Sequence, residues 1–132
     1  MPHAPKRVLV AEDNLGLAHV LQFNLERVGY AVTVAHDGAE AWEFAQREKF
    51  DVVITDQEMP LMTGVELCER LRERPEYETT PVVMVTARQL ELDVTTLQQR
   101  LGLAAIIPKP YSPEALMSTV EKLIAGEELL SQ

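Results

Sequence analysis

Short, continuously apolar runs alternate along the chain with longer segments whose apolar residues recur at helical spacing. An apolar run of this kind between polar or turn residues predicts a strand that is buried on both faces. The sequence has five such runs, at residues 6–11, 31–35, 50–55, 81–85 and 104–107. A segment with helical spacing follows each run, so the pattern predicts five strand–helix units in one α/β domain.

Each predicted helix has one apolar stripe. The residues expected to face the core are Leu17, Leu21, Leu25 and Val28 in the first helix, Ala41, Trp42 and Ala45 in the second, Val65, Cys68 and Leu71 in the third, Leu90, Val94, Leu97 and Leu101 in the fourth, and Leu116, Val120, Leu123 and Ile124 in the last. The first and third helices are predicted over residues 14–28 and 63–74. Core packing is favoured for Cys68 over a reactive thiol, because free cysteines are usually buried.

Polar caps and glycines mark the ends of these helices. Asn14, Asp37 and Ser112 precede helical segments and are residue types that cap a helix N-terminus. Gly29 and Gly102 follow the first and fourth stripes, where glycine commonly ends a helix. These signals agree with the periodicity and support the predicted boundaries.

Strands joined by helical crossovers must be mostly parallel, and each crossover is right-handed. The fold class predicted is therefore α/β, a flavodoxin-like doubly wound five-stranded parallel sheet with strand order 2-1-3-4-5 and five helices. In that order the switch point lies between the first and third strands, where ligands bind at the carboxyl ends of the strands.

Polar side chains stand at four of the predicted strand ends. Glu12 and Asp13 end the first run, Asp56 the third, Thr86 the fourth and Lys109 the fifth. Because the carboxyl ends of parallel strands meet at one edge, we expect these side chains to lie together. The order of acid pair, acid, hydroxyl and ammonium is far more specific than any one of these residues alone.

The length, charge and cysteine content of the chain exclude several classes of protein. A chain of 132 residues suits one domain, and its net charge of −9 argues against nucleic acid as a direct partner. No apolar stretch reaches the length of a membrane span, and the first residues lack a signal-peptide hydrophobic region, so a cytoplasmic location is expected. The single cysteine excludes an internal disulfide.

Five motifs resemble those of the receiver domain of two-component response regulators. They are Ala11-Glu12-Asp13-Asn14, Thr55-Asp56-Gln57-Glu58-Met59-Pro60, Gly64, Val85-Thr86-Ala87 and Pro108-Lys109-Pro110. The resemblance runs over residues 6–125, leaving residues 1–5 as an N-terminal tail and 126–132 as a C-terminal tail or the start of a linker. It implies that Asp56 accepts a phosphoryl group from a histidine kinase.

The resemblance also implies a metal. Three carboxylates at one edge need a counter-charge, and hard oxygen ligands suit Mg²⁺, for which Mn²⁺ can substitute. By resemblance, Asp13 and Asp56 bind the ion directly, the backbone carbonyl of Glu58 is a third ligand, and Glu12 acts partly through water. Thr86 and Lys109 are expected to contact the phosphoryl oxygens.

Two positions differ from the usual receiver pattern. Many receivers carry an aromatic residue three positions before the active-site lysine, where this chain has Ile106, for which simple core packing is the favoured interpretation. Tyr111, beyond Pro110, is the nearby aromatic residue and a weak candidate to substitute for it. Pro108 cannot donate a ladder hydrogen bond, which predicts that the last strand lies at an edge of the sheet. The Lys109–Pro110 peptide is cis if the resemblance holds.

The predicted function is a phosphorylation-dependent signalling switch, a regulatory domain that catalyses its own phosphorylation and dephosphorylation. Expected partners are a histidine kinase or phosphotransfer protein and an unidentified downstream protein, with no membrane and no direct nucleic acid; a weak homodimer is left open. The alternatives are a degenerate receiver that binds partners without phosphorylation, an Asp-nucleophile phosphatase and a flavodoxin-type electron carrier. The last would place its phosphate-binding loop at Glu12-Asp13, whose charges repel phosphate.

Overall fold

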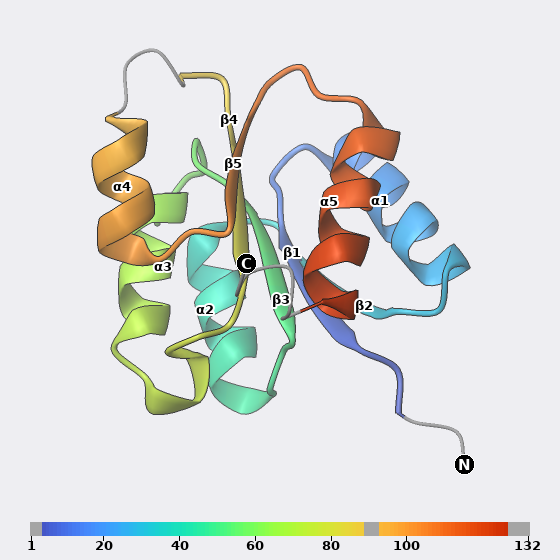
Figure 1. Cartoon of the computed structure of the whole chain (residues 1–132), viewed down its shortest axis with the longest axis horizontal. Helices are drawn as coiled ribbons and strands as arrows, with labels where there is room; N and C mark the ends of the chain where they lie inside the picture. Colours follow the sequence, from blue (N-terminus) through green and yellow to red (C-terminus); the bar gives the residue numbers. More distant parts are fainter. Residues whose placement is uncertain (1–3, 89–92, 127–132) are drawn as a thin grey trace.

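The computed structural model describes residues 4–88 and 93–126, which form a central sheet between two layers of helices (Figure 1). The strands are β1 Arg7–Ala11, β2 Ala31–Ala35, β3 Val52–Asp56, β4 Val82–Thr86 and β5 Ala105–Pro108. The helices are α1 Leu15–Arg27, α2 Gly38–Arg47, α3 Gly64–Arg72, α4 Val94–Leu101 and α5 Pro113–Ala125, with a short 3₁₀ helix η1 at Pro75–Tyr77. Within the described residues, no helix combines the length and apolar character that crossing a membrane requires.

The sheet has the order β2-β1-β3-β4-β5, and every neighbouring pair is parallel. The predicted fold class is therefore confirmed, including the position of the last strand at an edge. Helices α1 and α5 cover one face of the sheet, and α2, α3 and α4 cover the other (Figure 1). This arrangement leaves the carboxyl ends of the strands clear of both helical layers.

Two apolar clusters, one on each face, hold the layers together. Under α2, α3 and α4 the largest fully buried side chains include Phe50, Leu67 and Tyr77. Under α1 and α5 the cluster includes Leu25 and Leu116, which are also fully buried. β3 and β4 are buried along their whole length, as their continuous apolar sequence predicts.

The predicted N-cap residues and terminal glycines are confirmed. The side chains of Asn14, Asp37 and Ser112 each accept a hydrogen bond from the backbone N–H three residues on, which satisfies a free donor of the first turn. Gly29 and Gly102 both have positive φ, at 103° and 63°, where a residue with a side chain would be strained.

The prediction that Val28 faces the core was wrong. Val28 is 47% exposed and is the C-cap of α1, where the Gly29 N–H already bonds to the Glu26 carbonyl in a turn. The helical period no longer applies beyond this point, so the side chain leaves the buried face. Ala18, which the stripe omitted, is buried instead.

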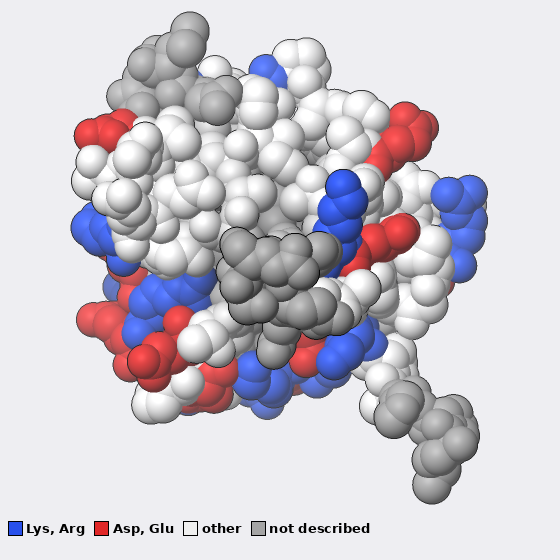
Figure 2. Space-filling model, viewed as in Figure 1, with Lys and Arg blue, Asp and Glu red and all other residues white. Residues whose placement is uncertain are grey.

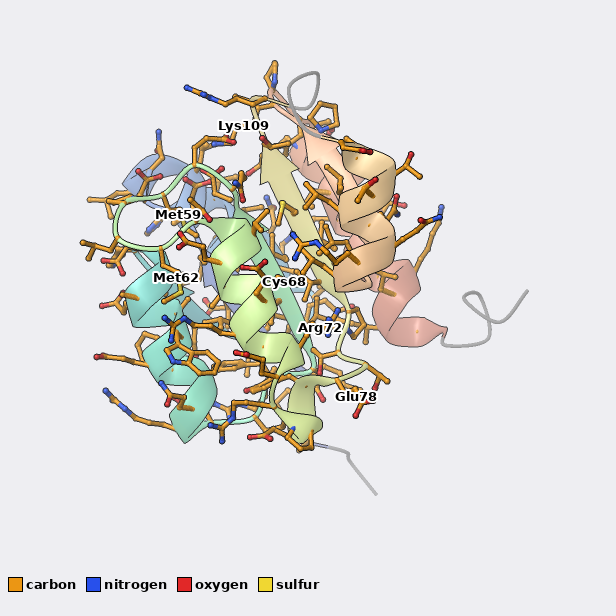
Figure 3. All side chains as sticks on the ribbon, turned by 90° about the vertical axis from the view of Figure 1, so that its left-hand side faces the viewer. Met59, Met62, Cys68, Arg72, Glu78 and Lys109 are labelled. Atoms are coloured by element: carbon orange, nitrogen blue, oxygen red, sulfur yellow. The ribbon has the colours of Figure 1, made fainter. Side chains whose placement is uncertain are left out.

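The third helix is shorter than predicted. A capping box between Thr63 and Glu66 starts α3, which ends at Arg72. Helix α4 begins at Val94 after the N-cap Asp93, and Leu90 lies outside the described residues. Cys68 is fully buried in α3, which confirms its assignment to the core (Figure 3).

Helix α4 is held mainly at its C-terminal end. Leu101 is its one buried residue. The Arg72 guanidinium, on the last turn of α3 (Figure 3), donates to the Leu101 carbonyl at 2.7 Å and the Gly102 carbonyl at 3.1 Å. It also donates to the Tyr77 carbonyl at 2.6 Å. One side chain thereby ties together the ends of α3, η1 and α4.

Gly64 allows the start of α3 to pack directly against the end of β3. An ideal Cβ at this position would lie 2.5 Å from the Asp56 carbonyl oxygen and 3.0 Å from the Gln57 Cα. The Gly64 N–H also donates to the Gln57 carbonyl at 3.1 Å. The backbone that carries Asp56 is therefore fixed against α3 at a distance that a side chain would prevent.

Gly64→Ala is expected to lower the free energy of unfolding by about 1–3 kcal/mol, because the added methyl group would overlap the Asp56 carbonyl. Gly16→Ala is the matched control, since a Cβ there meets only the Asn14 Oδ1, at 3.4 Å, and lies in α1, where alanine is the better helix former. Urea unfolding should show Gly16→Ala to be at least as stable as wild type. Wild-type stability of Gly64→Ala would contradict the close approach.

Candidate functional site

The acidic residues at the ends of β1 and β3 lie side by side. The two strands are parallel neighbours with Ala11 opposite Thr55, so the residues that follow meet at one edge. Carboxylate oxygens of Glu12, Asp13 and Asp56 lie within 4.8 Å of one another. Asp56 and Glu12 are buried, whereas Asp13 is exposed. This all-oxygen donor set fits a hard divalent cation such as Mg²⁺.

Burial dominates the electrostatics of Glu12, which is only 3% exposed. Loss of hydration raises the pKa of this carboxyl group to about 7. A 3.0 Å hydrogen bond from the Asn14 N–H opposes the rise, and the negative charge of Asp56 adds to it. The charged form of Glu12 is therefore disfavoured in the folded protein, and a bound cation would favour it.

Lys109 provides the positive charge at this edge. Its Nζ lies 2.6 Å from Asp56 Oδ2, and the Glu58 N–H donates to Asp56 Oδ1 at 3.2 Å, so both oxygens of Asp56 accept a hydrogen bond. Burial works against the ammonium charge. Attraction and hydrogen bonding to Asp56, with Glu12 and Glu58 nearby, outweigh burial and raise the pKa of Lys109. Lys109 is therefore a cation at neutral pH.

The end of β5 fixes where Lys109 sits. In the β4–β5 register Pro108 is opposite Thr86, a place from which no N–H donates to β4, so proline is tolerated there. The Thr86 carbonyl accepts from the Lys109 N–H at 2.9 Å, which is the ordinary hydrogen bond of a parallel ladder. This hydrogen bond holds the Lys109 backbone against the end of β4, and the next peptide bond, Lys109–Pro110, is cis as expected.

Thr86 and the following residue contact Glu58. The Thr86 hydroxyl donates to Glu58 Oε2 at 2.6 Å and accepts from the Arg88 N–H at 3.0 Å. The Ala87 N–H donates to Glu58 Oε1 at 2.9 Å. The Glu58 carboxylate thus bridges from the segment after β3 to the end of β4, a contact that the sequence analysis did not anticipate.

Ile106 stands at the position where many receivers have an aromatic residue, and Tyr111 is the nearby aromatic residue of this chain. Ile106 is half-buried and packs against the cluster under α2, α3 and α4, in agreement with the core-packing interpretation. The Tyr111 hydroxyl is buried and has no hydrogen-bond partner among the described residues. Burial, together with the charges of Glu12 and Asp56, raises the pKa of Tyr111 to about 12.

The structure brings the predicted site residues to one end of the molecule. Lys109 and Met59 mark this end in Figure 3, with Arg72 and Glu78 toward the other. The three acids form the cluster described above, Lys109 contacts Asp56, and Thr86 ends the adjacent strand. The expected use of the Glu58 carbonyl as a metal ligand stays a prediction.

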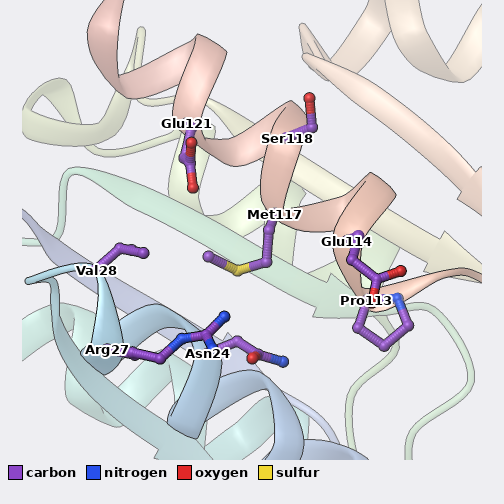
Figure 4. A pocket seen from close by; sticks show the side chains of 8 residues that line it. All are labelled: Asn24, Arg27, Val28, Pro113, Glu114, Met117, Ser118 and Glu121. Carbon is purple, nitrogen blue, oxygen red and sulfur yellow. The ribbon is translucent and has the colours of Figure 1, made fainter.

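A groove lies between α1 and α5, and none of Glu12, Asp13 and Asp56 lines it. This groove has a volume of about 300 Å³ (Figure 4). Met117 projects from α5 toward Val28 at the end of α1, and Arg27 and Glu121 add charge to the lining. Its mixed lining differs from the all-oxygen donor set at the strand ends.

Known proteins are similar to this chain in sequence and fold. The family model for the response regulator receiver domain matches residues 8–121. The alkaline phosphatase synthesis transcriptional regulatory protein PhoP of Bacillus subtilis (strain 168) is 36% identical over 124 residues, which cover 94% of this chain and 50% of PhoP.

Solved structures give the same result. The chemotaxis response regulator CheY4 of Vibrio cholerae is 32% identical with a TM-score of 0.82, covering 90% of this chain and 98% of CheY4. The CheY-like response regulator receiver domain protein from Methanospirillum hungatei JF-1 is 28% identical with a TM-score of 0.83, covering 94% and 98%.

The chain belongs to the response regulator receiver domain family and is a receiver domain of two-component signalling. Its Glu12, Asp13 and Asp56 form an acidic group of the kind typical of the receiver Mg²⁺ site. Receiver domains partner with histidine kinases. The chain spans half the length of the PhoP relative.

Neutralising Glu12 is expected to change how the stability of the chelator-treated protein depends on pH. Because the folded pKa of about 7 exceeds the ordinary value of 4.5, the folded state binds this proton more tightly than the unfolded state. The resulting stabilisation is complete below pH 4.5 and is lost as pH rises through 7. Relative to wild type, Glu12→Gln should therefore gain about 2–3 kcal/mol between about pH 5 and pH 8.

Urea unfolding at several pH values checks this expectation. Glu78→Gln is the control, because Glu78 is exposed and lies toward the opposite end of the molecule (Figure 3). Its stability relative to wild type should stay constant over the same range. A pH-independent difference for Glu12→Gln would show that Glu12 is not held as a high-pKa carboxyl group.

Proposed function

We propose that Asp56 accepts a phosphoryl group from a histidine kinase or phosphotransfer protein and that the domain passes the signal on through protein contacts. The observation that carries the proposal is the buried Asp56 carboxylate, which lies within 4.8 Å of two further acids and 2.6 Å from Lys109. A nucleophilic carboxylate beside an acidic metal site and a fixed cation has the groups that phosphoryl transfer requires.

The chemistry of the step is a displacement at phosphorus. One Asp56 oxygen attacks the phosphorus atom in line, the bond from phosphorus to the donor atom breaks, and the donor keeps the electron pair. The product is an acyl phosphate on Asp56. Lys109, already at the carboxylate, can then neutralise a phosphoryl oxygen, and the Thr86 hydroxyl can donate to another.

A divalent cation belongs at the same edge. Asp13 and Asp56 would bind it directly, the Glu58 carbonyl would supply a third oxygen, and Glu12 would act partly through water. When bound, Mg²⁺ or Mn²⁺ neutralises charge on the phosphoryl oxygens and on the acids. The exposed position of Asp13 leaves the site open to the solvent from which the ion and its waters come.

Among the alternatives, a degenerate receiver would lack one of these groups, whereas this chain has the acids, the hydroxyl residue and the lysine at one edge. An Asp-nucleophile phosphatase would place its nucleophile after the first strand, but Asp56 ends β3. A flavodoxin-type carrier would bind its phosphate at Glu12 and Asp13, whose charges repel phosphate and which the structure places together with Asp56. Phosphorylation of Asp56 is therefore the function that these positions support best.

The distribution of charge on the surface indicates which kind of partner the domain contacts. In the view of Figure 2, Lys and Arg side chains alternate with Asp and Glu, and this face shows no continuous positive surface. Together with the net charge of −9, this supports protein contacts over direct nucleic-acid binding. The downstream protein and any weak homodimer are not identified by these features.

Acetyl phosphate with Mg²⁺ is expected to add one phosphoryl group to the protein, at Asp56. Asp56→Asn should show no adduct in intact-mass spectra, because a neutral amide is a poor nucleophile. Asp51→Asn is the matched control: Asp51 precedes β3 at its other end, where it accepts a hydrogen bond from the Arg7 N–H at 2.7 Å. An adduct of equal yield on Asp56→Asn would sink the assignment.

Asp13→Asn is expected to weaken Mg²⁺ binding by about tenfold or more, and by more than Glu12→Gln, because Asp13 is expected to be a direct ligand. Isothermal calorimetry of the three proteins measures the difference. Trp42 should report little of this binding, since its ring packs near the Arg74 guanidinium, at 5.9 Å, just beyond the far end of α3. Equal Mg²⁺ affinity in wild type and Asp13→Asn would exclude Asp13 as a ligand.

A further inference from the structure

The Glu58 carboxylate uses two donors at the end of β4. Its Oε2 accepts from the Thr86 hydroxyl at 2.6 Å, and its Oε1 accepts from the Ala87 N–H at 2.9 Å. The hydroxyl distance lies in the range of charge-assisted hydrogen bonds, and the amide distance is that of an ordinary N–H···O bond. The two donors therefore form a small anion-binding pair, and a side chain of the domain itself occupies it.

This pair of donors lies beside the phosphoacceptor. Glu58 is two residues from Asp56, and its N–H donates to Asp56 Oδ1 at 3.2 Å. The ends of β3 and β4 are paired, with Asp56 opposite Val85, the residue before Thr86. A phosphoryl group on Asp56 would bring new anionic oxygens to the space that the Glu58 side chain spans.

Each donor can serve only one strong acceptor at a time. A hydroxyl group and a backbone amide each have a single hydrogen to donate. The Thr86 oxygen also accepts a hydrogen bond from the Arg88 N–H at 3.0 Å. Its own hydroxyl hydrogen is donated to Glu58. Carboxylate and phosphoryl oxygens are consequently mutually exclusive partners for Thr86 and Ala87.

We propose that Glu58 competes with the phosphoryl group for Thr86 and Ala87, so that its carboxylate must leave these donors before they can bind phosphorylated Asp56. This inference rests on the proposed function of Asp56. Glu58 is a positioning residue here: it holds the end of β4 in the unphosphorylated arrangement and lowers the affinity of the site for a phosphoryl group. Because Glu58 is only half-buried, its carboxylate can move into water when displaced.

The test measures binding of beryllofluoride, a phosphoryl mimic, in the presence of Mg²⁺. Glu58→Ala should lower the half-saturating concentration by about tenfold, equivalent to about 1.4 kcal/mol, because the two donors are then free. Glu58→Gln keeps one carbonyl oxygen as an acceptor and should give a smaller gain. Glu78→Ala removes the same charge toward the other end of the molecule (Figure 3) and should bind as wild type does.

A second readout needs neither metal nor mimic. In chelator-treated protein, amide hydrogen exchange at Ala87 should be at least severalfold faster in Glu58→Ala than in wild type, because the Glu58 acceptor is lost. Exchange in Glu78→Ala should be unchanged. Equal protection of Ala87 in Glu58→Ala and wild type would show that the contact does not form in solution and would overturn the proposal.

The outcomes separate this inference from the function on which it rests. If wild-type protein binds no beryllofluoride, phosphorylation of Asp56 itself is in error. If wild type binds it and Glu58→Ala binds equally or more weakly, Glu58 supports the site instead of competing for it. If Glu58→Gln gains as much as Glu58→Ala while Ala87 stays protected in Glu58→Gln, charge repulsion alone accounts for the gain, and competition is rejected.

Discussion

The buried carboxylates of Glu12 and Asp56 lie at one edge of the sheet, and the positions of the other site residues depend on this placement. Parallel pairing of β1 with β3 places Glu12 and Asp13 beside Asp56, and no rotation of a side chain can separate strand ends that the ladder holds together. Acids at this distance in a poorly hydrated place repel one another. Lys109 offsets part of that repulsion through Asp56, while burial, with a smaller contribution from the charge of Asp56, raises the pKa of Glu12.

The same constraint explains why the order of elements matters more than any single residue. Lys109 comes from β5, which is separated from β3 by β4, yet its ammonium reaches Asp56. The backbone contributes to this reach, because the Thr86 carbonyl accepts a hydrogen bond from the Lys109 N–H and so holds the Lys109 backbone at the end of β4. Gly64 adds a restraint from the other side by letting α3 pack on the Asp56 backbone.

Sequence periodicity and chain order were enough to predict the sheet, the helix caps and the meeting of Asp56 with Glu12, Asp13, Thr86 and Lys109 at one edge. The sheet and the meeting of these residues depend on the pairing of strands. Continuous apolar runs determine that pairing, whichever conformations the individual side chains adopt. The errors and omissions arise where side chains choose among local partners. Val28 left the core because the helix had already ended, and the Glu58 bridge to Thr86 and Ala87 depends on rotamers that no periodic pattern encodes.

The attachment of α4 has a consequence for local stability. With Leu101 as its one buried residue and Arg72 bonded at its last turn, this helix has its stabilising contacts concentrated at one end. The free energy needed to detach its first turns is accordingly a small part of the free energy of global unfolding. Hydrogen exchange in α4 should therefore be graded along the helix, slowest near Leu101, while β3 and β4 exchange only when the whole domain opens.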